Sequence, residues 1–553
     1  MRLRFCLILL LFLTWNVSAW QIVEFCPDPY LSGDPDEYMV IEGYGCTDGL
    51  VVTDGEGGFR FPPGTVLEGR TTIARNGAAF YTIHGYYPDF EWEYCHVSVP
   101  DVQRSGRLQL ANSQDEIQLF VYTTLLQEIA WPGDVHPRQG QVHYLEGDEW
   151  DRRILLLGQS RFSEAEFTGI PGTAFVSPDC SYPVFEEAVN CAQESILLNV
   201  YEFTSMKMAE LLVSAKKRGV NVTVLLEGGP VGGIPAEERT VIRRLSENGI
   251  RVLQMSITDD FHAPYRFNHA KYMVIDGCRV LITSENFKEN GFPDPGISGN
   301  RGWGVCLEDE GLASYFADIF EYDCSGAWIE EASGAGGIED DPYFRQYEVE
   351  FEPVEFTSAH VIPVISPDTS HLVREMLEGA IESIAIEEAY ITNVSSDQLN
   401  PFLGAAIDAS RRGVTVRVLL DSYWYNVEDE CDNDEMAGFI NSLAAREGIL
   451  LEARCADLDL NNLEKIHNKG VIVDGRSVLV SSINWNFNSP NFNREVGVII
   501  TEPQTAAYFL SAFDDDWNAA SCQDSDNSFD YLKLAITGVV ILALVLLYLH
   551  RRR

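Results

Sequence analysis

The C-terminal part of this 553-residue chain contains one sequence pattern twice. Residues 217–222 (KRGVNV) return as 411–416 (RRGVTV), and residues 194–196 (ESI) return as 382–384. These repeated segments keep their order and lie roughly 190 residues apart, a spacing far longer than that of a solenoid repeat. The duplication therefore predicts two equivalent half-domains related by a pseudo-twofold axis, in a chain that is too long for a single core.

Each copy predicts an α/β half. An amphipathic helix with a basic last turn ends at a glycine, and a largely apolar, β-branched strand follows it. Strands of this composition are typical of a sheet that is covered on both faces. We therefore expect two α-β-α sandwich halves, at residues 173–340 and 341–522. The helices are expected at 208–217 and 403–412, and the strands at 220–226 and 414–420.

Both copies contain the pattern H-x-K-x-x-x-x-D, whose Asp is followed by Gly and then by a second strand that ends in Ser-x-Asn. Alternate residues of a strand share a face, and Asp-Gly between two apolar runs is a strong hairpin signal. Each hairpin should therefore bring its Ser-x-Asn end back beside its His-x-Lys start. The residues are His269, Lys271, Asp276, Ser284 and Asn286 in the first copy, and His467, Lys469, Asp474, Ser482 and Asn484 in the second.

This set of side chains suits a phosphodiester. Lysine neutralises phosphate oxygens, and asparagine and serine donate to the charge that builds in the transition state. Two imidazoles can face each other across the twofold axis: one attacks phosphorus, and the other protonates the leaving oxygen and then activates water. One copy of the motif could arise by chance, whereas two copies inside a duplication are a strong signal. Because the cations already neutralise phosphate and the cysteines lack metal-ligand spacing, we expect neither a metal nor another cofactor.

On these residues, the region after about residue 173 resembles the phospholipase D superfamily, since both of its signature motifs are matched. The resemblance implies a covalent phosphohistidine intermediate, with His269 as the nucleophile and His467 as the general acid. The lysines and asparagines of both motifs would then hold the phosphate. Asp276 and Asp474 match the motif aspartates, which includes them in the catalytic set, but their opposite strand parity indicates a structural role at the turn.

One element of the resemblance is present in only one half. Residues 493–497 (NREVG) resemble the carboxylate-bearing segment that orients an active-site histidine, which gives that role to Glu495. The corresponding first-half segment, NRGWG, has Gly302 in place of the carboxylate. One imidazole would then lack its orienting partner, or borrow Glu308 or Asp309.

The region before the duplication predicts an all-β domain. Short strand-like runs separated by glycine and proline turns favour a sandwich at residues 20–131, followed by a polar connector at 132–172. The sandwich region resembles the lamin-tail domain, which implies an immunoglobulin-like fold used for adhesion or positioning; a plain spacer fits as well. The resemblance lies in residues 22–25 (IVEF), 27–29 (PDP), 36–38 (DEY), 53–55 (TDG), 61–65 (FPPGT) and 114–119 (QDEIQL).

The two ends of the chain predict export and membrane attachment. Residues 1–19 combine basic residues, a short apolar run and a Val-Ser-Ala site, as a cleaved signal peptide does. Residues 530–550 contain an apolar run that three arginines follow, which favours a single transmembrane helix with a cytoplasmic tail and an extracytoplasmic body in the cell membrane. The formal charge of -45 would repel extended nucleic acid.

These features predict a metal-independent phosphoric diester hydrolase of the phospholipase D type at the outer membrane surface. Tethering favours phospholipid headgroups over nucleic acid as substrates. A nuclease and a phosphatidyl transferase use the same chemistry and are the alternatives. A surface-binding protein with a vestigial catalytic half is the alternative of another class, favoured by Gly302 and opposed by the two complete His-Lys pairs. Residues 423–425 (YWY) are an aromatic cluster that could equally line the mouth of the site or pack locally.

Overall fold

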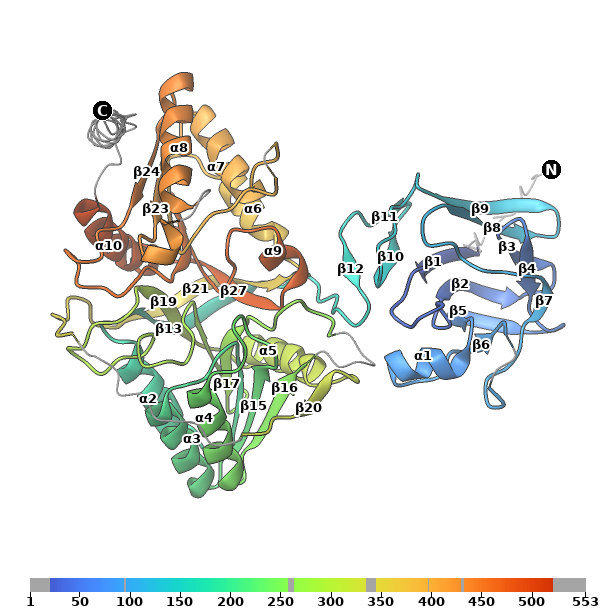
Figure 1. Cartoon of the computed structure of the whole chain (residues 1–553), viewed down its shortest axis with the longest axis horizontal. Coiled ribbons are helices and arrows are strands. Elements are labelled where there is room, and N and C mark those ends of the chain that lie inside the picture. Colours follow the sequence, from blue (N-terminus) through green and yellow to red (C-terminus); the bar gives the residue numbers. More distant parts are fainter. Residues whose placement is uncertain are drawn as a thin grey trace, which may run out of the picture.

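The computed structural model describes residues 20–93, 96–256, 263–334, 345–395, 397–428 and 432–520. The expected signal peptide at 1–19 and the expected transmembrane helix at 530–550 both lie outside these ranges. Within them, no helix is long and apolar enough to cross a membrane. The described ranges form a β-sandwich and a larger α/β body, which lie side by side (Figure 1).

One 15-stranded sheet runs through the whole α/β body, which confirms the expected mixed α/β fold. Its central strands β13 and β21 pair antiparallel at the junction of the halves. Outward from them the strand order is β19-β18-β17-β14-β15-β16 in the first half and β27-β26-β25-β22-β23-β24 in the second, with β20 added at the first edge. The first-half strands are β13 (Phe167–Ser177), β14 (Ser195–Val200), β15 (Asn221–Glu227), β16 (Arg251–Met255), β17 (Lys271–Ile275), β18 (Arg279–Thr283), β19 (Gly302–Glu308) and β20 (Ile329–Glu331). The second-half strands are β21 (Val354–Ser366), β22 (Ser383–Glu388), β23 (Thr415–Leu420), β24 (Leu451–Cys455), β25 (Lys469–Val473), β26 (Ser477–Ser481) and β27 (Glu495–Thr501).

Helices cover both faces of this sheet (Figure 1). Helices α2 to α4 pack over an apolar core of the first half, and α6 to α8 pack over one of the second. Helices α5 and α10 pack in a third core that draws residues from both halves, so the halves share one interior. The helices are α2 (Ser181–Cys191), α3 (Met206–Arg218), α4 (Ala236–Glu247), α5 (Glu310–Asp323), α6 (His371–Glu378), α7 (Pro401–Arg411), α8 (Asn433–Glu447), α9 (Asn488–Phe492) and α10 (Pro503–Ala519), with a 3-10 turn η1 at Trp424–Asn426.

The predicted helix at 208–217 shows how residues at the ends of a segment determine its structure. Helix α3 follows Ser205, whose hydroxyl accepts a hydrogen bond from the backbone N–H of Met208. It ends at Gly219, whose φ of 103° an L-residue rarely adopts. Strand β15 follows directly, in parallel register with β14.

The N-terminal region forms two facing sheets around one apolar core. Strand β10 pairs with β1, so part of the expected connector at 132–172 belongs to this sandwich. The last residues of that connector begin β13. The lamin-tail resemblance stays a prediction. One sheet contains β1 (Gln21–Cys26), β2 (Tyr38–Cys46), β5 (Val66–Ala74), β6 (Phe90–Glu91), β10 (Gln141–Glu146), β11 (Glu149–Trp150) and β12 (Leu155–Leu156). The other contains β3 (Leu50–Thr53), β4 (Gly57–Arg60), β7 (Gln103–Gly106), β8 (Asp115–Val121) and β9 (Thr124–Trp131), and one helix, α1 (Gly77–His84), follows β5.

Candidate active site

The two motif histidines occupy equivalent positions, two residues before β17 and β25 begin. Each backbone N–H donates across the junction of the halves. His269 N donates to Arg494 O at 2.8 Å, and His467 N donates to Arg301 O at 2.9 Å. Because Arg494 precedes β27 and Arg301 precedes β19, each histidine is attached to a strand of the opposite half. The two motifs, which lie far apart in the sequence, therefore meet at one place.

Each imidazole also contacts a carboxylate of the other half. Nδ1 of His269 lies 2.8 Å from Oε2 of Glu495. Nδ1 of His467 lies 3.2 Å from Oε1 of Glu285. A carboxylate acceptor favours the proton on Nδ1, which leaves Nε2 of each ring as the reactive nitrogen. Both histidines thus have an orienting partner.

Glu285 replaces the carboxylate that Gly302 lacks. A Cβ atom on Gly302 would lie 2.4 Å from Oε1 and 2.6 Å from Cγ of Glu285, so the Glu285 side chain fills the space that a larger residue would need. In the second half Ile483 stands at the position equivalent to Glu285, and the carboxylate comes from β27 as Glu495. The two halves therefore reach the same contact from different strand positions.

The substitutes expected for the missing carboxylate are wrong. Glu308 lies at the far end of β19, opposite Arg279. Asp309 caps α5, where its carboxylate accepts from the N–H of Leu312 at 2.7 Å. The sequence contained a signal for Glu285. The first half has Gly302 where the second has Glu495, and the same half has Glu285 where the second has Ile483.

The two histidine–carboxylate pairs differ in their electrostatics. Burial alone would raise the pKa of Glu495, but His269, Lys271 and the Ser482 hydroxyl hold it below its usual value. Burial raises the pKa of Glu285, against the opposing effect of nearby lysines. Glu495 is therefore the more acidic of the two carboxylates, and it is the partner of His269.

Both motif lysines are buried beneath the histidines. Nζ of Lys271 donates to the carbonyl oxygen of His269 at 2.9 Å, and Nζ of Lys469 donates to that of His467. Burial lowers the pKa of Lys271 to about 7 and that of Lys469 to about 8. Burial also lowers the pKa of His269, and burial together with the lysines lowers that of His467 further. The site thus concentrates cationic groups in a place with little solvent, which favours an incoming anion.

The asparagine and the serine of each Ser-x-Asn tail differ in their contacts. Asn286 and Asn484 are slightly exposed, and the Oδ1 atom of each has no hydrogen-bond partner among the described residues. Ser284 and Ser482, which were also expected to contact substrate, are buried like the lysines, and their contact with substrate stays a prediction. The Ser284 hydroxyl accepts from Trp303 N at 3.0 Å, and the Ser482 hydroxyl donates to Oε2 of Glu495 at 2.6 Å.

The motif aspartates lie at the far end of the hairpins, and their place in the catalytic set is corrected here. The Asp276 carboxylate accepts from the backbone N–H groups of residues 193–195 at 2.7 to 2.9 Å. Asp474 binds residues 381–383 in the same way, at 2.7 to 3.1 Å. Each aspartate starts its turn at positive φ, 52° and 55°. These bonds fasten each hairpin to the start of the neighbouring strand, β14 or β22.

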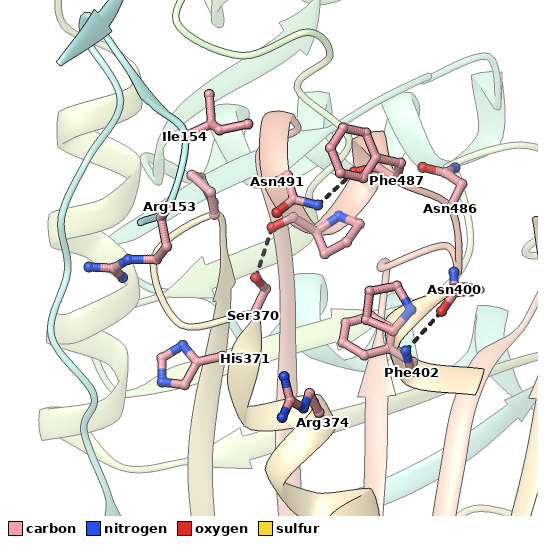
Figure 2. A pocket seen from close by; sticks show the side chains of 13 residues that line it. Arg153, Ile154, Ser370, His371, Arg374, Asn400, Phe402, Asn486, Phe487 and Asn491 are labelled. Carbon is pink, nitrogen blue, oxygen red and sulfur yellow. Dashed lines mark hydrogen bonds between the residues drawn. The ribbon is translucent and has the colours of Figure 1, made fainter. Parts of the chain in front are cut away.

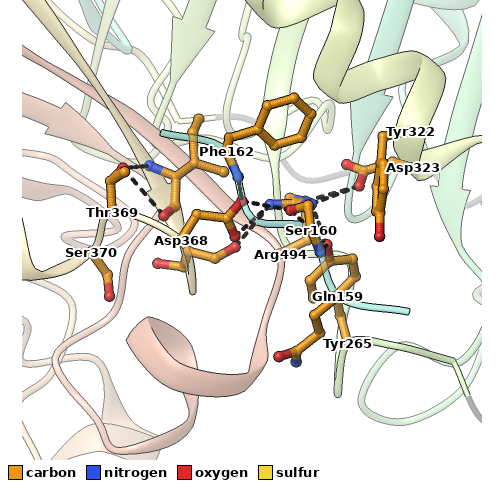
Figure 3. A network of polar contacts seen from close by, with 12 residues as sticks. Gln159, Ser160, Phe162, Tyr265, Tyr322, Asp323, Asp368, Thr369, Ser370 and Arg494 are labelled. Atoms are coloured by element: carbon orange, nitrogen blue, oxygen red, sulfur yellow. Dashed lines mark hydrogen bonds and ion pairs between the residues drawn. The ribbon is translucent and has the colours of Figure 1, made fainter. Parts of the chain in front are cut away.

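Two buried arginines fix the segments that hold the histidines. Arg494 donates to Oδ1 of Asp323 at 2.9 Å and to Oγ of Ser160 at 2.6 Å, and Ser160 in turn donates to Asp368 (Figure 3). Arg301 makes the equivalent clamp through Asp179 and Asp516. These arginines were not predicted as site residues. Through Ser160, the network also attaches the end of the expected connector to the strand that carries Glu495.

A cavity of about 220 Å³ adjoins the second-half tail beyond Asn484. Figure 2 shows Asn486, Phe487 and Asn491 on one side and Arg153, His371 and Arg374 on the other. Its lining contains no acidic residue, although each of the three basic side chains pairs with a carboxylate outside it. Across the described ranges, no group of three or more His, Cys, Asp and Glu side chains is placed to hold a metal ion.

A duplicated α/β sheet with two crossed His-x-Lys motifs defines a member of the phospholipase D superfamily. Residues 185–324 and 373–517 match the family model described as cardiolipin synthase, PLD-like domain, and the chain belongs to this PLD-like family. A curated relative is the probable cardiolipin synthase YwiE of Bacillus subtilis (strain 168), which is 26% identical over 353 residues. That match covers 61% of this chain and 64% of the relative.

Two solved structures overlap parts of the chain. Phosphatidylserine synthase of Haemophilus influenzae Rd KW20 is 12% identical, covers 68% of this chain and 96% of its own, and has a TM-score of 0.47. The phospholipase D family member Nuc of Salmonella typhimurium is 21% identical, covers 31% of this chain and 99% of its own, and has a TM-score of 0.25. The assignment does not depend on either likeness.

Proposed function

We propose that this chain cleaves phosphodiesters in two steps, with His269 as the nucleophile and His467 as the general acid and base. The observation that carries the proposal is the crossed pair of histidine–carboxylate contacts. These contacts leave two Nε2 atoms available at one site that also contains Lys271 and Lys469. His269 suits the nucleophilic role because its partner Glu495 is held ionised, which favours the tautomer with a lone pair on Nε2.

In the first step, Nε2 of His269 attacks phosphorus while the bond from phosphorus to the leaving alcohol breaks, and His467 gives its proton to that oxygen. In the second step, a water or an alcohol gives its proton to His467, attacks phosphorus and releases His269. His467 is neutral in the free site because burial and lysines lower its pKa. A bound diester brings a negative charge among those groups and so favours the protonated form that the first step needs.

We infer that the substrate is a phospholipid headgroup diester and that the favoured acceptor is water, at the outer membrane surface. The expected membrane helix at 530–550 and the acidic composition support lipid over nucleic acid. Transfer to a second lipid alcohol is the other candidate, favoured by the descriptions of the matched family and relative. Gly302 no longer favours the alternative of a vestigial catalytic half, because Glu285 supplies the carboxylate that contacts His467.

The full chain in detergent, treated with a metal chelator, tests this function on mixed micelles of phosphatidylglycerol. Hydrolysis yields phosphatidic acid and glycerol, whereas transfer yields diphosphatidylglycerol and glycerol, so lipid analysis separates the two. We expect His269→Ala and His467→Ala to abolish turnover, and His360→Ala, on the exposed part of β21, to retain it. The enzyme proposal fails if lipid, oligonucleotide and aryl diester are all left intact, or if both motif variants keep full activity.

A further inference from the structure

A third lysine stands beside the catalytic pair in one half only. Lys465 precedes His467 by two residues, as Phe267 precedes His269. The backbone confirms that the two positions are equivalent, because Arg301 N donates to Lys465 O at 2.9 Å and Arg494 N donates to Phe267 O at 2.9 Å. The pseudo-twofold axis thus relates a phenylalanine to a lysine.

Lys465 carries a positive charge without a carboxylate partner in contact. Its Nζ donates to the hydroxyl of Tyr425 at 3.2 Å and lies 5.9 Å from the centroid of that ring. Within the described ranges it makes no ion pair, whereas Lys207 and Lys288 both pair with glutamate. Lys465 is partly exposed, and its charge acts on both Glu285 and His467. Glu285 and Asp421 act on this charge without contacting it, so the ammonium group can accept an anion without first breaking an ion pair.

The position equivalent to Lys465, at the other end of the site, is aromatic. The ring of Tyr201 lies 4.7 Å from that of His269 and 6.0 Å from that of Phe267. The ends therefore differ at this position, where Phe267, on the His269 side, has no charge and Lys465 adds an ammonium group near His467. Because attack by His269 expels a group that His467 protonates, the leaving or entering alcohol lies on the His467 side. Lys465 is thus close to that alcohol and not to the group retained on phosphorus.

We propose that Lys465 and Tyr425 form a subsite for a second negative charge, a phosphate or carboxylate carried by the alcohol that leaves from or adds to phosphorus. This inference rests on the proposed function and narrows its substrates to headgroups with an anionic substituent. The Tyr425 hydroxyl accepts from Lys465 and can donate its own proton to the anion. A charge-assisted contact of this kind discriminates by about tenfold or more.

Serine and ethanolamine headgroups provide a matched test, since they differ by one carboxylate. Dihexanoyl phosphatidylserine and dihexanoyl phosphatidylethanolamine are offered as monomers to the full chain and to Lys465→Gln. We expect the unaltered enzyme to prefer the serine lipid in kcat/KM, and Lys465→Gln to reduce that preference about tenfold, mainly through KM. Lys207→Gln removes the same charge from a paired surface site and should leave the preference unchanged. Equal losses for both lipids in Lys465→Gln would overturn the subsite.

A binding measurement keeps this proposal separate from the proposed function. Calorimetry with O-phosphoserine and phosphoethanolamine needs no turnover. We expect O-phosphoserine to bind more tightly to the unaltered chain, and the difference to disappear in Lys465→Gln but not in Lys207→Gln. If the chain cleaves no lipid yet shows this difference, the subsite holds and the hydrolytic function fails. If both compounds bind alike, the subsite is wrong whatever the turnover.

Discussion

Nδ1 of His467 lies 3.2 Å from Oε1 of Glu285, a residue that belongs to the opposite half of the duplication. Its counterpart, His269, receives Glu495 from the strand β27 instead. The orienting carboxylate thus occupies a different strand position in each half, while its contact with an imidazole is the same. Each half therefore serves as a control for the other, because it shows the second position from which a carboxylate can reach an imidazole.

The carboxylate of the first half should be movable to the position used in the second half only when both residues, Glu285 and Gly302, are changed together. Glu285→Ile alone copies Ile483 but leaves His467 without a carboxylate, and should lower kcat by about 10- to 100-fold. Gly302→Glu alone forces its side chain against Glu285, whose Oε1 lies 2.4 Å from the new Cβ position, and should be less stable. The double variant should recover activity above Glu285→Ile. Steady-state kcat of the three variants checks this; a double variant no better than the single one would argue that Glu285 only fills space.

The division of labour between the histidines can be separated with p-nitrophenyl phosphodiesters. A nitrophenolate leaves without protonation, so the first step no longer needs an acid. His467→Ala should therefore release one equivalent of nitrophenol in a burst and retain phosphorus on His269, while His269→Ala should show no burst. Stopped-flow absorbance and mass spectrometry of the trapped chain measure both. A burst in His269→Ala, with none in His467→Ala, would reverse the assignment.

The pH dependence follows from the direction of each shift. On a p-nitrophenyl diester, whose first step needs no acid from His467, kcat/KM reports the nucleophile and the lysines. Burial lowers the pKa of His269 below its usual 6.5, so kcat/KM should rise with pH over a range that lies below that value. Lys271 and Lys469, with pKa values of about 7 and about 8, lose their charge as pH rises, so kcat/KM should fall from about pH 7 and more steeply above about pH 8. A bound diester anion raises the lysine pKa values, which places the basic limb of kcat at higher pH than that of kcat/KM. Profiles of both constants test this, and coincident basic limbs would count against the lysines as phosphate ligands.

The motif aspartates should affect stability more than chemistry. Asp276→Ala and Asp474→Ala each remove the acceptor for backbone N–H groups of the preceding strand, at a partly exposed turn, and should cost about 1 kcal/mol of unfolding free energy. Asparagine keeps one acceptor and tolerates the positive φ, so Asp276→Asn should cost less. Denaturant unfolding measures the cost, and kcat should stay within about threefold. A loss of kcat comparable to that of His269→Ala would return the aspartates to the catalytic set.

Features with a local cause could be predicted from the sequence. The α/β halves, the hairpins and the position of α3 follow from periodicity, Asp-Gly turns and a terminating Gly219, all of which act within a few residues. Strand parity also indicated the turn role of Asp276. The crossed contacts could not be predicted in this way, because Glu285 and His467 are 182 residues apart and meet only through the shared interior.

Two further features of the site were not evident from the sequence, for physical reasons. Ser284 shares a strand face with Asn286, but its hydroxyl is taken up by the neighbouring strand β19, which sequence parity does not reveal. Lys465 lies outside the motif pattern, and only its match to Phe267 through the backbone bonds of Arg301 and Arg494 shows that it belongs to the site.

The crossed contacts also govern when activity can first arise during synthesis. His269 and its carboxylate Glu495 are separated by 226 residues, and the strand that carries Glu495 is the last of the sheet. A ribosome that has completed the first half has made a histidine without its partner, and a carboxylate, Glu285, whose histidine does not yet exist. On the proposed mechanism, we therefore expect the nascent chain to lack activity until its final strand is in place, and a chain truncated before residue 495 to be inactive.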